Sequence, residues 1–247
     1  MNNNGFNLSY EELIVIAAFL NNNCILGIDS SLDGKPYTFT SKKMISIIKG
    51  MERKRLLKIG MEGVVFIRKE LKKMVQVICA PEYIIEITPS SIQNNVMYVF
   101  KKESVIVFLK QKTPYLFTLT VNEKILSLFD IIQKKAWGES TLCELKQSSF
   151  ETLKRYYNRF EEDKAKSLIE LLSLTDSGEV IELLAQGSLP LSKMVVFQKN
   201  NALYKTIHSF CFFRFNQGIY EFDSYGERVC VNKLNPSFEK GINTLLS

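Results

Sequence analysis

The feature that most constrains the fold is a run of strand-like segments, joined by short links, in the part of the chain that follows Pro81. Before Pro81 the apolar residues recur with the 3.6-residue period of a helix, and after it they follow the two-residue period of a strand. Strands are predicted at 83–88, 96–101, 104–110 and 115–120. A link such as Lys102-Glu103 is far shorter than the dozen or so residues that a parallel crossover needs. The sequence therefore predicts an antiparallel meander.

The same order of elements is predicted a second time further along the chain. Helices are expected at 123–134, 150–172 and 178–185, strands at 194–199, 203–215, 219–223 and 228–231, and a last helix at 236–246. A shift of 113 residues places Tyr98–Lys101 on Cys211–Arg214 and Asn122 on Asn235. Identities are few, so two explanations stay open: an internal duplication, or a chance alignment of two segments with similar elements.

These patterns indicate an α+β fold in which antiparallel β-meanders are flanked by helices. If the repeat is an internal duplication, the halves are related by a quasi-two-fold axis. Residues 1–121 then form a half with helices and a meander, and residues 122–247 form a second half of the same kind. We expect the two halves to belong to one compact domain.

The N-terminal region is predicted to be helical. Ser9 and Glu12 have the spacing of a capping box, in which the Ser9 hydroxyl accepts from the Glu12 N–H and the Glu12 carboxylate accepts from the Ser9 N–H. This helix runs to about Leu20, and two more are expected at 41–51 and from about Arg68 to just before Pro81. With a short strand at 64–66, the order resembles a winged helix.

The segment from Lys42 to Lys73 is strongly basic. It holds eleven Lys and Arg residues against three acids, in a chain whose net charge is +6. A basic winged helix can neutralise several phosphates, so a nucleic-acid-binding regulator is the alternative function. However, residues 42–50 offer only lysines and a serine for reading base edges, and Gly50 interrupts the helix. We therefore expect these charges to solvate helix ends or to face an acidic partner.

No residue pattern predicts a catalytic centre, a cofactor site or a metal site. The sequence contains no dinucleotide-binding, P-loop or nucleophile-elbow motif. A zinc site needs about four nitrogen or sulfur ligands brought together. The single histidine, His208, lies on a predicted strand, and no two cysteines have CxxC spacing. The five cysteines are Cys24, Cys79, Cys143, Cys211 and Cys230. We expect buried free thiols and no enzymatic activity.

Membrane insertion is not expected either. No apolar run reaches the roughly 18 residues of a membrane span. The longest run near the N-terminus, Leu13–Leu20, follows two glutamates instead of a basic stretch, which argues against a secretory signal. The expected location is the cytoplasm.

Both faces of the predicted strand 203–215 are apolar. Phe213 lies on one face, and Phe210 and Phe212 lie on the other. Either the protein's own helices cover both faces, or one face binds a partner. On the second explanation Phe210, Phe212 and Phe213 are candidate partner contacts.

The predicted helix 150–172 supplies two further candidate contacts. Tyr157 and Phe160 share a side of this helix with Phe150 and Leu153. Such an apolar stripe is more often part of a core than of an interface. Tyr157 and Phe160 are nevertheless the residues of this helix that we assign to partner binding.

Residues 8–28 carry a resemblance to a known group of proteins. Leu8–Leu20 combines an acidic helix start with an apolar helix, and the segment NNNCILGI at 21–28 is a small polar turn that leads into Leu-Gly-Ile. This opening resembles those of small cytosolic proteins encoded beside Gram-positive type VII secretion genes. The order of elements over most of the chain is similar to that of the EspG family of ESX secretion chaperones, which have a quasi-two-fold α+β fold.

The resemblance implies a cytosolic chaperone or targeting factor. Its partner would be a helical-hairpin secretion substrate or toxin of the WXG100 or LXG type, encoded at the same locus, with the secretion ATPase as a further partner. Such substrates present amphipathic helices with an apolar seam, which an exposed sheet or groove can cover. The resemblance transfers no individual binding residues, and it leaves the oligomeric state open.

Overall fold

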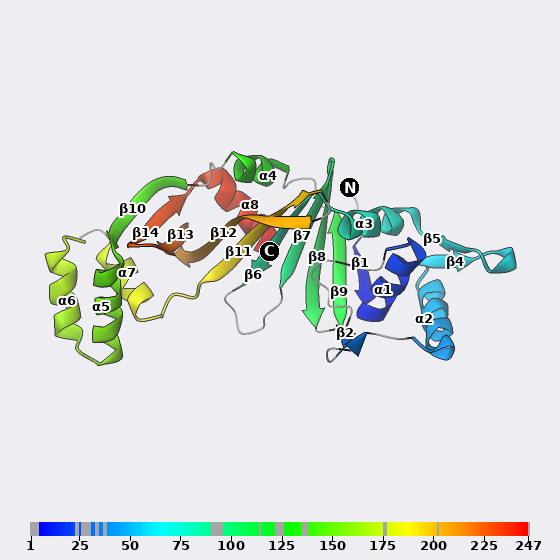
Figure 1. Cartoon of the computed structure of the whole chain (residues 1–247), viewed down its shortest axis with the longest axis horizontal. Coiled ribbons are helices and arrows are strands. Elements are labelled where there is room, and N and C mark those ends of the chain that lie inside the picture. Colours follow the sequence, from blue (N-terminus) through cyan, green and yellow to red (C-terminus); the bar gives the residue numbers. More distant parts are fainter. Residues whose placement is uncertain are drawn as a thin grey trace. The chain divides into compact units, whose positions relative to one another are not determined.

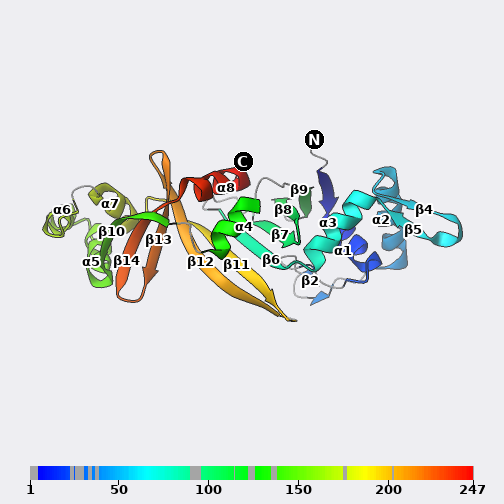
Figure 2. The same cartoon turned by 90° about the horizontal axis from the view of Figure 1, so that it is seen from above.

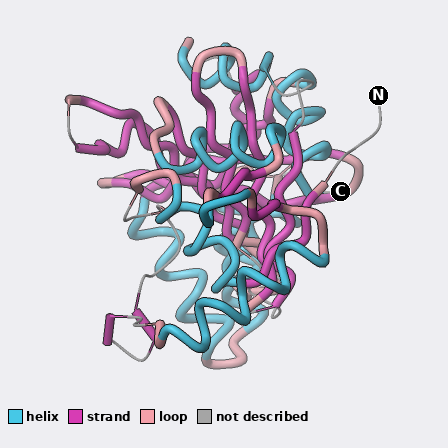
Figure 3. Tube along the Cα trace, turned by 90° about the vertical axis from the view of Figure 1, so that its right-hand side faces the viewer, coloured by secondary structure: helices cyan, strands magenta, loops and turns pink. Residues whose placement is uncertain are grey.

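The computed structural model confirms the predicted α+β class (Figure 3, helices cyan and strands magenta). It describes residues 5–22, 25, 31–32, 35–36, 39–89, 96–113, 115–121, 126–134, 138–174, 177–201 and 203–246. Ten strands form one antiparallel sheet in the order β1-β9-β8-β7-β6-β11-β12-β13-β14-β10, and eight α-helices accompany it within the described ranges. Two short two-stranded sheets lie outside it.

The chain divides into two compact units, each of which draws on separate stretches of sequence. Unit 1 contains residues 1–87, 95–123 and 196–207, and unit 2 contains 88–94, 124–195 and 208–247. The tip of the β11–β12 hairpin therefore belongs to unit 1, although both strands begin or end in unit 2.

Unit 1 combines three helices with the first meander (Figure 1). The helices are α1 (Tyr10–Phe19), α2 (Ser41–Arg53) and α3 (Lys69–Cys79). The strands of the large sheet are β1 (Phe6–Ser9), β6 (Tyr83–Thr88), β7 (Met97–Lys102), β8 (Val105–Thr113) and β9 (Leu116–Val121). The small sheets pair β2 (Ser31–Leu32) with β3 (Lys35–Pro36) and β4 (Leu57–Ile59) with β5 (Val65–Ile67). Strand β1 was not predicted, and it extends the sheet beyond β9.

The core of unit 1 forms where α1 and α3 pack against the meander. Leu71, Val75 and Ile78 follow the predicted helical period and are buried, as are Leu13 and Ile16 on α1. The predicted capping box is confirmed at the start of α1, because Glu12 N–H donates to the Ser9 hydroxyl over 3.2 Å and Ser9 N–H donates to the Glu12 carboxylate over 2.8 Å.

Residues 196–207 are fixed to unit 1 by polar contacts at the start of β6. Lys199 N–H donates to the Glu82 carbonyl over 2.8 Å. The Gln198 amide donates to the Tyr83 hydroxyl, also over 2.8 Å. The Tyr204 hydroxyl donates to the Pro81 carbonyl over 2.8 Å.

Unit 2 combines five helices with the second meander. Its helices are α4 (Leu126–Gln133), α5 (Gln147–Asn158), α6 (Glu162–Leu171), α7 (Gly178–Ala185) and α8 (Pro236–Leu246). Its strands are β10 (Gly138–Lys146), β13 (Gly218–Tyr225) and β14 (Arg228–Leu234), and it shares β11 (Ser192–Asn200) and β12 (Leu203–Phe215) with unit 1. Figures 1 and 2 show α4 beside α8, and they pack so closely that a β-carbon at Gly241 would lie 2.9 Å from Leu128 Cδ1.

The repeated order predicted from the sequence occurs in the structure. Strands β7, β8 and β9 precede α4, and β12, β13 and β14 precede α8. The shift of 113 residues also preserves hairpin register, since Tyr98 pairs with Leu109 and Cys211 pairs with Phe222. Asn122, predicted to precede the first of these helices, lies outside the described residues.

One predicted helix needs correction. The single helix expected at 150–172 is two helices, α5 and α6, because the chain turns at Phe160. The short strand expected at 64–66 is present as β5, and its partner β4 was not predicted. Strand β10 was not predicted either, and its register with β14 shifts twice, which disturbs the alternation that predicts a strand.

Candidate partner-binding surfaces

The predicted aromatic strip lies inside unit 2. Phe210, Phe212 and Phe213 are 8%, 1% and 1% exposed. The Phe210 ring lies 5.8 Å from Phe238 of α8, and the Phe213 ring stacks on Tyr220 at 5.7 Å. Phe213 also belongs to the core that α5 and α7 close. Of the two explanations for the apolar strand, the structure thus shows the first, since the protein's own helices cover both faces, and these three rings offer little surface to a partner.

The turn between α5 and α6 ends the first helix with a Schellman motif. Phe160 has a left-handed backbone, with φ of 58°. Its N–H donates to the Tyr157 carbonyl over 3.0 Å, and Glu161 N–H donates to the Tyr156 carbonyl over 2.9 Å. These bonds satisfy the last carbonyls of the helix, so the turn has a defined geometry.

Phe160 breaks two local rules within this turn. The left-handed position of a Schellman motif usually holds glycine, as Gly187 does after α7, because a β-carbon there is strained. A phenylalanine ring is also usually buried, whereas Phe160 is 91% exposed. A large apolar side chain held on the surface at a strained backbone position is a candidate partner contact.

Leu171 and Tyr157 complete the description of this helical pair. Leu171, the last residue of α6, is 80% exposed, and Ala165 is the buried residue of that helix. Tyr157 is half-buried. Burial, followed by the nearby Glu182 carboxylate of α7, raises the pKa of Tyr157 to about 12. Tyr157 therefore faces the neighbouring helix, and the exposed apolar contacts of the pair are Phe160 and Leu171.

Unit 1 presents a second apolar surface, on the β4–β5 hairpin, which the sequence reading missed. Its exposed apolar side chains are Ile59, Met61, Val64 and Phe66. Met61 is 93% exposed at the tip, where Glu62 and Gly63 both have left-handed backbones. The available signal was a pair of short strand-like runs, Leu57-Lys-Ile and Val65-Phe-Ile, because two such runs separated by five residues that include glycine predict a hairpin.

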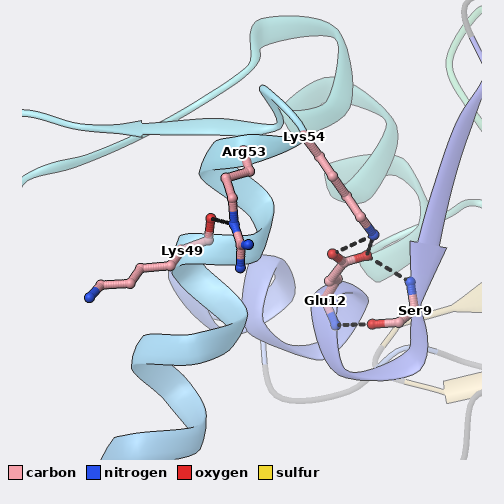
Figure 4. Close-up of polar contacts among 5 residues, drawn as sticks. All are labelled: Ser9, Glu12, Lys49, Arg53 and Lys54. Carbon is pink, nitrogen blue, oxygen red and sulfur yellow. Dashed lines mark hydrogen bonds and ion pairs between the residues drawn. The ribbon is translucent and has the colours of Figure 1, made fainter.

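Part of the basic segment serves the structure of unit 1. Lys54 Nζ lies 2.8 Å from Glu12 Oε1, so the carboxylate that caps α1 also holds the end of α2 (Figure 4). Lys43 pairs with Glu11 at 2.6 Å, and Arg68 pairs with Glu70 at 3.1 Å. Within the described ranges, the other eight cations of the segment form no ion pair. They are Lys42, Lys49, Arg53, Arg55, Lys58, Lys69, Lys72 and Lys73.

Metal-ligating side chains and thiols lie scattered over the described part of the chain. No cluster of three or more His, Cys, Asp and Glu side chains there is placed to hold a metal ion. Burial raises the pKa of the Cys143, Cys211 and Cys230 thiols. Of the helices that the structure describes, none is long and apolar enough to cross a membrane.

Comparison with known proteins gives a likeness at the level of structure. No protein-family model matches the sequence, and no curated protein matches it. Among solved structures, the chain is similar to the type VII secretion system chaperone EspG5 of Mycobacterium tuberculosis, solved in complex with a PE25–PPE41 dimer. The TM-score is 0.55 at 9% sequence identity, over 98% of this chain and 95% of that one. The resemblance to EspG proteins is thus confirmed at the level of the fold.

Proposed function

We propose that this chain is a cytoplasmic chaperone of the EspG type, which binds a helical secretion substrate and catalyses no reaction. The fold supports this proposal, because it matches nearly the whole length of a chaperone that was solved with a protein dimer bound. The substrate class that we assign is a helical hairpin of the WXG100 or LXG type, a toxin included, and the secretion ATPase is the proposed recipient.

The observation that carries the proposal is Phe160. Its ring is 91% exposed at a left-handed backbone position, which disfavours residues with a β-carbon, and so exposed a ring contributes little packing to offset that strain. Aromatic side chains that become buried on association are the usual energetic centres of protein interfaces. The α5–α6 pair also exposes Leu171, which extends the apolar surface to the last residue of α6. We assign Phe160 and Leu171 as the contacts for the apolar seam of a substrate helix.

Co-expression with helical-hairpin proteins encoded beside this chain tests the proposal. We expect a stable complex that co-elutes on gel filtration and is weakened by the double change Phe160→Ser and Leu171→Ser. Serine suits the turn, because Ser173 occupies the same left-handed cap position after α6. Leu203→Ser is the matched control, since Leu203 is an exposed leucine in unit 1. A complex that survives the double change would refute the assignment of Phe160 and Leu171 as contacts. Failure to form a complex with any of the neighbouring proteins would refute the chaperone function.

The nucleic-acid alternative rests on the eight unpaired cations. Against it, the hairpin that would act as the wing of a winged helix carries Met61 and Val64 at its tip, where phosphate binding requires cations. Retention on duplex DNA measured against salt concentration separates the two functions. Steep loss of retention with salt would favour the regulator.

A further inference from the structure

We propose that the β4–β5 hairpin and the cations around it form a docking surface for an anionic lipid membrane. On this proposal, unit 1 rests in the headgroup layer while the hairpin tip reaches the apolar boundary below it. The surface lies on unit 1, so it is separate from the substrate contacts assigned to unit 2. Membrane docking is therefore proposed independently of the chaperone function.

The hairpin presents one face to the core and the other to solvent. Its cross-strand pairs place Leu57 and Ile67 together on one face, and Leu57 is buried. Lys58 and Phe66 form the pair on the opposite face, and Phe66 is 60% exposed there. A β-carbon at Gly60 would lie 2.7 Å from Phe66 Cε2, so the ring lies directly over that glycine. The exposed face thus combines a cation with a fixed aromatic ring.

Two backbone hydrogen bonds close the turn at the tip and lower the cost of moving it into an apolar layer. Gly60 N–H donates to the Val64 carbonyl over 2.7 Å, and Gly63 N–H donates to the Gly60 carbonyl over 3.3 Å. Backbone groups that are already paired avoid the desolvation cost that excludes irregular chain from lipid. In Figures 1 and 2 the hairpin projects from unit 1 beyond α2 and α3. Met61 is therefore the apolar side chain placed to reach the membrane first.

The charge around the hairpin matches an anionic surface. The eight unpaired cations of the basic segment are exposed on α2, on the turn that follows α2, on the hairpin and on α3. Figure 4 shows Lys49 extending away from α1, in contrast to Lys54, which turns toward Glu12. The three acids of the segment are Glu52, whose carboxylate accepts from Ile59 N–H, Glu70, which pairs with Arg68, and Glu62 at the tip. Clustered cations beside exposed apolar side chains are the features that hold peripheral proteins on anionic lipid.

The choice of cation favours lipid over a protein partner. Six of the eight unpaired cations are lysines. Lysine is depleted at protein interfaces, because its ammonium is strongly hydrated and costly to bury. On a membrane the same ammonium stays in the hydrated headgroup layer, and only the apolar tip loses water.

Vesicle co-sedimentation of the full chain tests the proposal. We expect binding to vesicles of equimolar phosphatidylglycerol and phosphatidylcholine, weakening with salt, and no binding to phosphatidylcholine alone. Met61→Ser should weaken binding about tenfold, because it removes the most exposed apolar side chain of the tip. Glu62→Gln should strengthen binding, because it removes an anion that faces anionic lipid. Leu203→Ser, which changes an exposed leucine elsewhere in unit 1, should leave binding unchanged.

Three results would overturn the proposal. The first is absence of binding to the anionic vesicles. The second is unchanged vesicle binding by the Met61→Ser and Phe66→Ser variants, which would indicate that only the opposite charges of protein and vesicle attract each other. The third is loss of the helical substrate on Met61→Ser with vesicle binding intact, which would make the hairpin a protein-docking surface. Unfolding curves should coincide for the parent chain and Met61→Ser, because Met61 is 93% exposed.

Discussion

Replacing Phe160 by glycine is expected to stabilise the fold and to weaken partner binding. A left-handed backbone costs a residue with a β-carbon about 1–2 kcal/mol, and glycine does not pay it. Glycine loses more chain entropy on folding, which offsets about 0.5–1 kcal/mol of that gain. Full burial of a phenylalanine side chain contributes about 1.5–3 kcal/mol to stability. Because Phe160 is 91% exposed, removal of its ring should cost only a few tenths of a kcal/mol. The net stabilisation by Phe160→Gly is therefore about 0.5 kcal/mol.

Phe160→Ala is the matched control, because it removes the ring and keeps the strained β-carbon. We expect the glycine variant to be more stable than the alanine variant by about 1 kcal/mol, or about 2–4 °C in a domain of this size. Urea and thermal unfolding of the three proteins measure this difference, and gel filtration with the helical partner should show that both variants bind less well than the parent chain. Equal stability of the glycine and alanine variants would refute the strain argument. Full binding by either would refute the role of the ring.

Three further predictions concern the rest of the chain. Glu12→Ala should destabilise unit 1 by about 1–3 kcal/mol in urea unfolding, since it removes the capping carboxylate and the partner of Lys54, whereas Ser9→Ala should cost only about 1 kcal/mol. Burial and the Glu86 carboxylate opposite it raise the pKa of Tyr98 to about 12, so the folded state disfavours the ionised phenol. The free energy of unfolding should therefore be constant below pH 10, the pKa of the unfolded chain, and should fall as the pH rises toward 12. This fall should be smaller in Tyr98→Phe. The native Cys143 thiol should react slowly with disulfide reagents at pH 8 and quickly in urea, because burial raises its pKa.

Elements whose apolar period is intact were predictable from the sequence. Helix α7 was predicted at its observed bounds, and so were β12 and α8. In each of these, local pattern and tertiary packing favour the same structure. The capping box before α1 was also readable, because its two partners lie three residues apart.

The break between α5 and α6 was not predictable, because no glycine or proline marks it. Phe160 takes the left-handed position that glycine usually takes, so the helical period of Phe150, Leu153 and Tyr157 simply ran on into α6. Burial of the aromatic strip was undecided for a different reason. An apolar strand face reads the same whether α8 or another protein covers Phe210.

Unit 1 can complete its folding only after residues 196–207 have been synthesised. The start of β6 bonds to Gln198, Lys199 and Tyr204, more than a hundred residues downstream. During synthesis the first meander therefore leaves the ribosome with one strand edge uncovered, and it stays so until most of the chain has emerged. An uncovered edge is a template for mispairing between nascent chains. A fragment that ends at residue 123 should aggregate, and adding a peptide that spans 196–207 should increase its solubility.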